Sequence, residues 1–146
     1  MGFWIFMLFM NLMMPAMMIG FGWVFLHKPP KTINWAYGYR TTMSTKNQDT
    51  WDFAHQYAGK LWFKWGKWLL ILSVVCMLLL IGKSEDVIGI AGSILCMVEL
   101  VPLVYVIVPT EKALKQTFDS RGNRRQPKEI AETGREQESS EESGEK

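Results

Sequence analysis

Three long apolar segments, separated by polar sequence, constrain this chain more than any other feature. They cover residues 3–26, 61–82 and 87–108. A helix needs about 20 consecutive, mostly apolar residues to cross the hydrocarbon core of a bilayer, and each segment reaches that length. We therefore predict an all-α membrane protein with three transmembrane helices.

The first two segments each contain a feature that a span must accommodate. Pro15 lies in the middle of the first segment, where a membrane helix tolerates it as a kink. No basic residue precedes this segment, which favours a retained helix over a signal peptide. The second segment includes Lys64 and Lys67, whose ammonium groups can reach the head groups. An interfacial or re-entrant helix is the alternative for this segment.

Only residues 82–86 separate the second and third segments. So short a connection predicts a helical hairpin in which the two spans pack antiparallel. Gly89 and Gly92 are small residues that permit close approach of a neighbouring helix.

The distribution of Lys and Arg predicts the orientation in the membrane. Residues 27–67 carry seven basic and two acidic residues, and five more basic residues lie within 109–125. The N-terminus has none, and the short turn has one. The positive-inside rule then predicts a multi-pass protein of the cell membrane with its N-terminus outside. The loop 27–60 and the C-terminus are expected in the cytoplasm.

Residues 1–118 are expected to form the membrane domain, and residues 119–146 a disordered, charged tail. The tail is polar, begins with basic residues and ends in acidic ones, so it buries too little apolar surface to fold. Its basic part could lie on anionic lipid, although a solvated tail is the simpler interpretation.

The loop between the first two spans ends in an amphipathic segment over residues 51–65. Asn47, Asp49 and Thr50 precede it and are all residue types that cap helix N-termini. We expect an interfacial helix that lies along the membrane surface and then enters the second span. Its apolar positions recur at helical spacing: Trp51, Ala54, Ala58, Leu61, Trp62 and Trp65.

A long, position-specific motif runs through this loop, and the chain from about residue 10 to residue 108 resembles the SdpI family. The family is named after an immunity protein against a secreted, sporulation-delaying toxin. The motif positions are Gly38, Tyr39, Arg40, Thr41, Ser44, Lys46, Asn47, Thr50, Trp51 and His55. The resemblance implies protection from a membrane-active toxin, or a membrane receptor that sequesters a transcriptional repressor. The expected partners are thus the lipid bilayer, a peptide toxin or a cytosolic repressor, and the motif is the candidate partner-binding or lipid-binding site.

Within the motif, Arg40 is the side chain best suited to binding. A guanidinium near the inner membrane surface could hold a lipid phosphate or a partner carboxylate through two hydrogen bonds. A topology anchor is the alternative. Gly38 is expected to allow a turn or a close backbone approach, and Trp51 to anchor the helix at the interface. Three further residues could form a network with Arg40 or simply cap turns: Ser44, Asn47 and Thr50.

Metal or cofactor binding is not expected. His55 is a single candidate ligand, whereas zinc takes three or four, although a pair with His27 stays open. Cys76 and Cys96 lie inside apolar segments without further soft ligands nearby, and such thiols behave as small apolar side chains.

Glu99 is the ionisable residue at bilayer depth, where a charged side chain costs at least about 2.5–3.5 kcal/mol. It could be protonated, or it could pair with Asn11 or with Lys64 or Lys67. A neutral acid that is hydrogen-bonded between helices is slightly favoured over a proton or ion path.

The sequence contains none of the enzyme signatures we considered, namely a Gly-rich phosphate loop, an HExxH motif or a nucleophile elbow. A net charge of +2 gives no reason to expect direct nucleic-acid binding. The predicted function is toxin immunity or signal relay, without catalysis. The alternatives are a small transporter or channel subunit that uses Glu99, which would require a homo-oligomer, and a structural subunit of a larger membrane complex.

Overall fold

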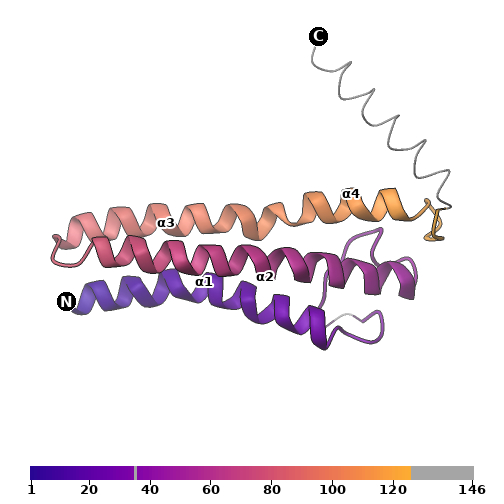
Figure 1. Ribbon diagram of the computed structural model, residues 1–146, viewed down its shortest axis with the longest axis horizontal. Coiled ribbons are helices and arrows are strands. Elements are labelled where there is room, and N and C mark those ends of the chain that lie inside the picture. Colours follow the sequence, from indigo (N-terminus) through magenta and orange to yellow (C-terminus); the bar gives the residue numbers. More distant parts are fainter. Residues whose placement is uncertain (35, 126–146) are drawn as a thin grey trace, which may run out of the picture.

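The structure is a computed structural model, and it describes residues 1–34 and 36–125. Four helices follow one another along the chain. The helices are α1 (Gly2–His27), α2 (Gln48–Leu79), α3 (Glu85–Tyr105) and α4 (Ile107–Thr117). In Figure 1, α1, α2 and α3 lie side by side as long rods, and α4 continues α3 end to end.

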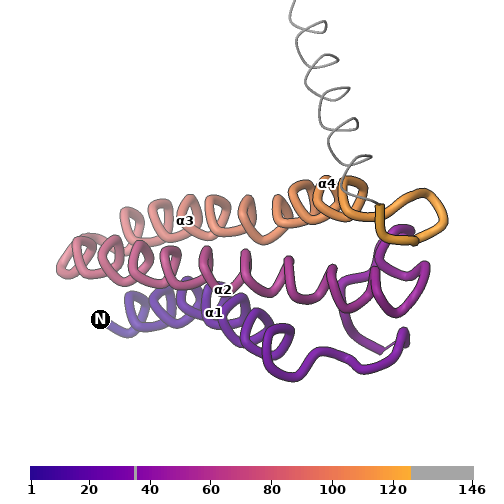
Figure 2. Tube along the Cα trace, turned by 45° about the vertical axis from the view of Figure 1, so that its right-hand side comes forward, coloured from indigo at the N-terminus to yellow at the C-terminus, as the bar shows by residue number. Residues whose placement is uncertain are grey.

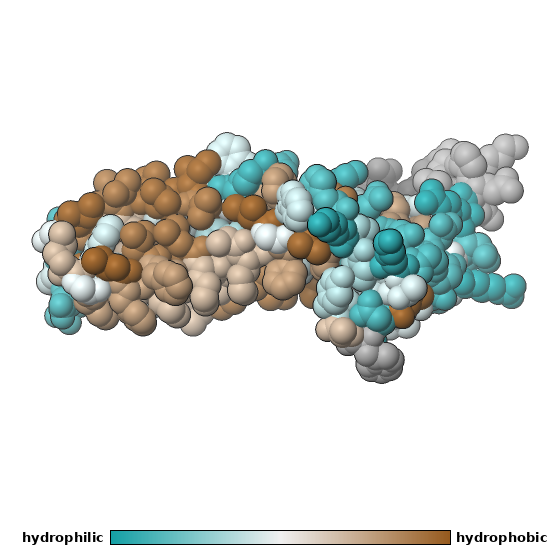
Figure 3. Space-filling view, turned by 90° about the horizontal axis from the view of Figure 1, so that it is seen from below, coloured by the Kyte–Doolittle hydropathy of each residue, from teal (hydrophilic) through white to brown (hydrophobic). Residues whose placement is uncertain are grey.

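Three helical stretches are long and apolar enough to cross a membrane: Gly2–His27, Gln48–Leu79 and Glu85–Thr117. The predicted all-α architecture with three spans is therefore confirmed. On the face shown in Figure 3, apolar side chains cover most of the length of the rods, and polar side chains gather at the end that carries the loop. This distribution is that of a multi-pass membrane protein with one polar end.

The predicted interfacial helix is the first part of α2. No break separates residues 51–65 from the second span, and the helix continues along one axis (Figure 1). Residues 51–65 therefore form no separate helix but run directly into the second span. On the apolar face of this segment, Trp51, Ala54 and Ala58 are fully buried by protein, whereas Trp65 is exposed.

The third predicted span, 87–108, is interrupted near its end. Helix α3 stops before Val106 and α4 begins after it. Pro109 has no amide hydrogen to donate to the carbonyl of Tyr105, so one bond of the helical ladder is missing at this point.

Helices α1 and α2 approach each other closely at three glycines, Gly22, Gly59 and Gly66. A Cβ atom on Gly22 would lie 2.6 Å from the backbone nitrogen of Phe63. One on Gly66 would lie 3.0 Å from the backbone nitrogen of Ile19, and one on Gly59 would lie 3.2 Å from the carbonyl oxygen of Gly22. Small residues at such positions allow close van der Waals contact between membrane helices.

Helix α3 also uses a glycine, and the helix it approaches is α1. A Cβ atom on Gly92 would lie 2.5 Å from the terminal methyl group of Met7 and 3.3 Å from the side-chain nitrogen of Asn11. The prediction that Gly92 permits close approach is confirmed, whereas a Cβ on Gly89 would make only ordinary contacts.

Residues 119–125 form a hydrogen-bonded turn, which corrects the prediction that the tail is disordered from residue 119. One carboxylate oxygen of Asp119 accepts hydrogen bonds from the backbone N–H groups of Arg121 at 2.8 Å and of Asn123 at 2.9 Å. These bonds, the one from Asn123 foremost, lower the pKa of Asp119. The remainder of the predicted tail, 126–146, lies outside the described residues.

A matched pair of substitutions tests the contact between α1 and α2. Gly22→Ala should destabilise the bundle by about 1–3 kcal/mol, because the new methyl group meets backbone that cannot move aside. Gly20→Ala makes the same change where a Cβ atom has open space around it, and should be neutral or slightly stabilising. Thermal unfolding of the purified protein in detergent measures both. Equal effects of the two changes would contradict the proposed close contact.

Candidate functional site

The described part of the connection between α1 and α2, residues 28–34 and 36–47, folds over the first turns of α2, and we call it the loop cap. Figure 2 shows it at one end of the molecule, beside the turn formed by residues 119–125. A cluster of buried apolar side chains joins the cap to three helices and to the residue after α4. Its members are Phe25, Tyr39, Met43, Ala54, Ala58, Val106, Leu114 and Phe118.

The imidazole of His55, on α2, holds the loop cap from inside. Its Nε2 atom accepts a hydrogen bond of 2.9 Å from the backbone N–H of Tyr39. Its Nδ1 atom lies 2.7 Å from the carbonyl oxygen of Trp51 and donates to it, because a carbonyl can only accept. The ring is therefore the neutral tautomer with its proton on Nδ1, and it is fully buried. Both ring nitrogens are occupied, so neither is available to a metal.

Gly38 lies directly against this histidine. Its φ of +134° belongs to the region that glycine adopts far more readily than other residues. A Cβ atom here would lie 2.6 Å from Nε2 of His55. The turn and close approach expected of Gly38 therefore exist, and what it approaches is the imidazole.

Trp51 supports the loop cap instead of anchoring it to lipid. The side chain is fully buried, and its indole N–H donates a 2.8 Å hydrogen bond to the carbonyl of Pro30. The expected role as an interfacial anchor is therefore wrong, since the indole has no contact with the surface.

The hydroxyl of Tyr39 links the loop cap to α4. It donates toward the carbonyl oxygen of Ile107 at 3.3 Å and a carboxylate oxygen of Glu111 at 3.4 Å. Burial, and then the charge of Glu111, raises the pKa of Tyr39, so the phenol keeps its proton as a donor.

Thr41 and Ser44 close a turn after Arg40. The backbone N–H of Thr41 donates to the Ser44 hydroxyl at 2.8 Å, and that of Ser44 donates to the Thr41 hydroxyl at 3.2 Å. The buried Ser44 hydroxyl donates in turn to the carbonyl of Tyr39 at 2.9 Å. The stretch that carries Arg40 is thus fixed on both sides by side-chain bonds.

Asn47 and Thr50 cap the N-terminus of α2. The Asn47 side chain accepts from the backbone N–H of Thr50 at 2.9 Å, and the Thr50 hydroxyl accepts from the backbone N–H of Asn47 at 3.1 Å. Ser44, Asn47 and Thr50 were expected either to form a network with Arg40 or to cap turns. The bonds described here are those of turns and helix caps.

The loop cap also holds the turn at residues 119–125. The Asn47 amide donates to the carbonyl of Gly122 at 2.6 Å, and the Lys46 ammonium group donates to the carbonyl of Ser120. Nothing in the sequence marked this contact, because it joins segments more than 70 residues apart through backbone carbonyls.

Arg40 is exposed on the outer surface of the loop cap, next to the buried Tyr39. The motif thus divides into two groups. Most of its side chains point inward and build the cap, whereas Arg40 and Lys46 are the basic motif residues on its surface.

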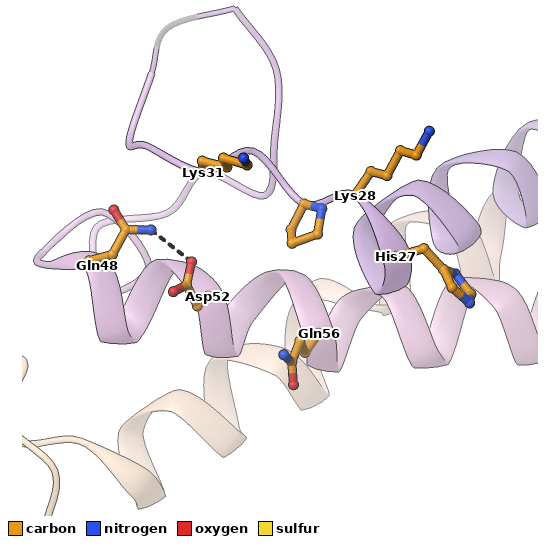
Figure 4. Close-up of a pocket in the computed structure, with 7 residues that line it drawn as sticks. His27, Lys28, Lys31, Gln48, Asp52 and Gln56 are labelled. Carbon is orange, nitrogen blue, oxygen red and sulfur yellow. Dashed lines mark hydrogen bonds between the residues drawn. The ribbon is translucent and has the colours of Figure 1, made fainter.

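A groove of about 660 Å³ lies beside the loop cap, between the end of α1 and the first turns of α2. Figure 4 shows Lys31 above α2, and the Gln48 amide, which donates a 2.7 Å hydrogen bond to Asp52. Basic and amide side chains dominate the lining: His27, Lys28, Pro29, Lys31, Gln48, Asp52 and Gln56. His27 lies here on the surface, so it does not form a pair with the buried His55.

A second polar group lies inside the membrane-spanning part, and we call it the polar cluster. It consists of Asn11 on α1, Ser73 on α2, and Cys96 and Glu99 on α3. The Cys96 thiol donates to the Asn11 side-chain oxygen at 3.3 Å, and the Asn11 amide donates to the carbonyl of Met7 at 2.8 Å. Three helices are therefore joined by polar contacts within apolar surroundings.

Glu99 is fully buried and pairs with Ser73. One oxygen, Oε1, is hydrogen-bonded to the Ser73 hydroxyl, which also lies 2.7 Å from the carbonyl of Leu69. The other oxygen, Oε2, has no hydrogen-bond partner. Asn11, Lys64 and Lys67, which the sequence offered as partners of Glu99, do not bond to it. Within residues 1–34 and 36–125, no group of three or more His, Cys, Asp or Glu side chains could hold a metal ion.

Comparison with known proteins gives the family. The SdpI/YfhL protein family matches residues 31–110, more than half of the chain, from the loop cap into the first turn of α4. This chain belongs to the SdpI/YfhL family. The uncharacterized protein YfhL of Bacillus subtilis (strain 168) is 32% identical over 97 residues, which cover 66% of this chain and 78% of YfhL. No solved structure matches significantly.

The bond between His55 and Tyr39 can be tested by hydrogen exchange. His55→Ala should raise the exchange rate of backbone amides in residues 38–46, because the buried amide of Tyr39 loses its acceptor, at a cost of about 1–3 kcal/mol. His27→Ala is the matched control, since the exposed His27 ring lies 3.0 Å from the carbonyl oxygen of Trp23 in its own helix and makes no bond to Tyr39. Exchange measured by mass spectrometry should separate the variants. Unchanged protection in His55→Ala would show that the cap is held in another way.

Proposed function

We propose that this protein is a membrane immunity or signal-relay protein of the SdpI type, which docks a partner or a lipid head group through the loop cap. In this proposal the loop cap and the C-terminus lie in the cytoplasm and the N-terminus lies outside. Arg40 makes the central contact, and the protein performs no catalysis.

The observation that carries this proposal is the division of the motif into an inner and an outer group. His55, Ser44 and Trp51 are buried and use their polar atoms to fix the loop cap. Arg40 is exposed on this fixed segment. A side chain on a rigid segment loses less conformational freedom when it binds, which raises the affinity that a small surface can reach.

The chemistry of Arg40 suits an anionic group. A planar guanidinium can donate two parallel hydrogen bonds to a carboxylate or a phosphate. The exposed Lys28 and Lys31 lie on the same end of the bundle, at the groove in Figure 4, and add positive charge. Such an end is expected on the cytoplasmic side, where the membrane surface is negative. An acidic region of a cytosolic repressor, a toxin bound at the membrane or an anionic lipid would each complement it.

A survival assay tests the proposal. The chain is expressed in a toxin-sensitive bacterial host, which is then challenged with a membrane-active peptide of the sporulation-delaying type. Wild-type protein should protect the host, and Arg40→Ala at matched membrane abundance should lose most of that protection. Arg121→Ala removes an exposed arginine from the turn at 119–125 and should protect like the wild type.

The same assay separates the other functions considered. Loss of protection in Glu99→Gln with Arg40→Ala still active would favour a transporter or channel subunit. Loss on truncation after Arg125, which leaves the turn at 119–125 in place, would favour recruitment into a larger complex. Absence of protection by well-inserted wild-type protein would contradict immunity against that toxin. Pull-downs with the wild type and Arg40→Ala would then decide whether the loop cap docks a regulator.

A further inference from the structure

We propose that Glu99 is a proton-binding site inside the membrane, where the bound proton links α3 to α2 through Ser73. The inference is independent of docking at the loop cap, because it concerns the opposite, membrane-embedded part of the bundle. It rests on the number of protons and acceptors that the polar cluster contains.

The Ser73 hydroxyl has one proton and two oxygen neighbours. The carbonyl oxygen of Leu69, at 2.7 Å, can only accept, so a hydrogen bond to this carbonyl takes the one serine proton. The second neighbour is Oε1 of Glu99. Once the serine proton is used, this contact is a hydrogen bond only if Glu99 is the donor. Glu99 is then a neutral carboxylic acid whose O–H donates to the Ser73 oxygen.

The unpartnered second oxygen supports the same assignment. An ionised carboxylate accepts several hydrogen bonds, and burying it with an empty oxygen is far more unfavourable than burying a neutral acid. Oε2 of Glu99 is buried and has no donor. In the neutral acid this atom is a carbonyl oxygen, which loses much less when it is left without a partner.

The surroundings supply no charge that would stabilise the ionised form. The titratable neighbour is the Cys96 thiol, one turn away on the same helix, and its proton is already donated to Asn11. From α2 the cluster receives Ser73, and from α1 it receives Asn11, neither of which carries a charge. Among the described residues, Glu99 has no cation within ion-pair distance.

Loss of the proton would therefore change the contact between two helices. The donor of the bond between Glu99 and Ser73 would disappear, and a negative charge would remain between α2 and α3. The serine proton could turn toward this charge only by leaving the carbonyl of Leu69. We infer that α2 and α3 pack less tightly when Glu99 is ionised.

Infrared spectroscopy of the full chain in nanodiscs of neutral phospholipid tests the proposal. A protonated carboxylic acid has a C=O stretching band that is separate from the amide bands. At neutral pH the wild type should show this band, and Glu99→Gln, which keeps the shape of the side chain, should lose it. Glu85→Gln is the matched control, because the Glu85 side chain is exposed in the first turn of α3, away from the polar cluster, and its replacement should leave the band unchanged.

A second variant keeps the carboxyl group and tests its partner. Ser73→Ala should retain the acid band but shift its frequency, since the O–H of Glu99 loses its acceptor. An unshifted band would contradict the assigned bond, and identical spectra for the wild type and Glu99→Gln would overturn the proton site. If Glu99→Gln inserts poorly, the spectra of the wild type and Ser73→Ala still test the proposal. The acid band in both proteins would support a protonated Glu99, and its absence from the wild type would overturn the proton site.

Hydrogen exchange tests the link between the helices. As the pH is raised above the range in which ordinary carboxyl groups titrate, amides around Glu99 should lose protection in the wild type. The loss should exceed that of Glu99→Gln at the same pH, because the glutamine cannot ionise. Equal exchange in both proteins throughout this range would overturn the inferred loosening of α2 and α3.

Discussion

The hydrogen bond from the Tyr39 amide to the His55 imidazole is the point at which the loop cap and the helical bundle become one structure. The imidazole can accept there because its other nitrogen donates to the carbonyl of Trp51, which fixes the tautomer. Gly38 must lack a side chain for the backbone to come this close. From the other side, the ring of Phe25 on α1 packs edge-on against the imidazole, with 4.7 Å between ring centroids. One buried side chain thereby fixes the loop to two helices.

The membrane-embedded part is held by a different kind of contact. Lipid tails are as apolar as the helix surfaces, so burial of apolar side chains gives little advantage to helix association there. Close approach at Gly22 and Gly59 brings the backbones of α1 and α2 together, and the polar cluster ties α3 to both. The position of His55, four residues before Gly59 on α2, depends on this approach. The rigid cap that presents Arg40 is therefore a consequence of how the spans pack.

Hydropathy and charge predicted the spans well, because the bilayer imposes a length and a composition that can be read along the chain. The position of the motif in the loop was also predicted from the sequence, but the roles of its individual side chains were not. Trp51 looked like an interfacial anchor and is buried, since a tryptophan beside a span fits either environment until the loop that covers it is known. The contact between Asn47 and Gly122 and the break before Pro109 depend on tertiary packing and on a single missing amide hydrogen. Neither the contact nor the helix break produces a periodic pattern in the sequence.

The central claim is that the motif is an internal scaffold closed on a neutral histidine, and nitrogen NMR of the protein in nanodiscs tests it most directly. The experiment looks for a scalar coupling across the hydrogen bond between the Tyr39 amide and Nε2 of His55, together with the chemical shifts of the ring nitrogens. The account predicts a detectable coupling, a protonated Nδ1 and an unprotonated Nε2. A protonated Nε2, or a ring that exchanges its protons freely with water, would contradict it. The motif would then have to be regarded as an open surface with no fixed cap behind Arg40.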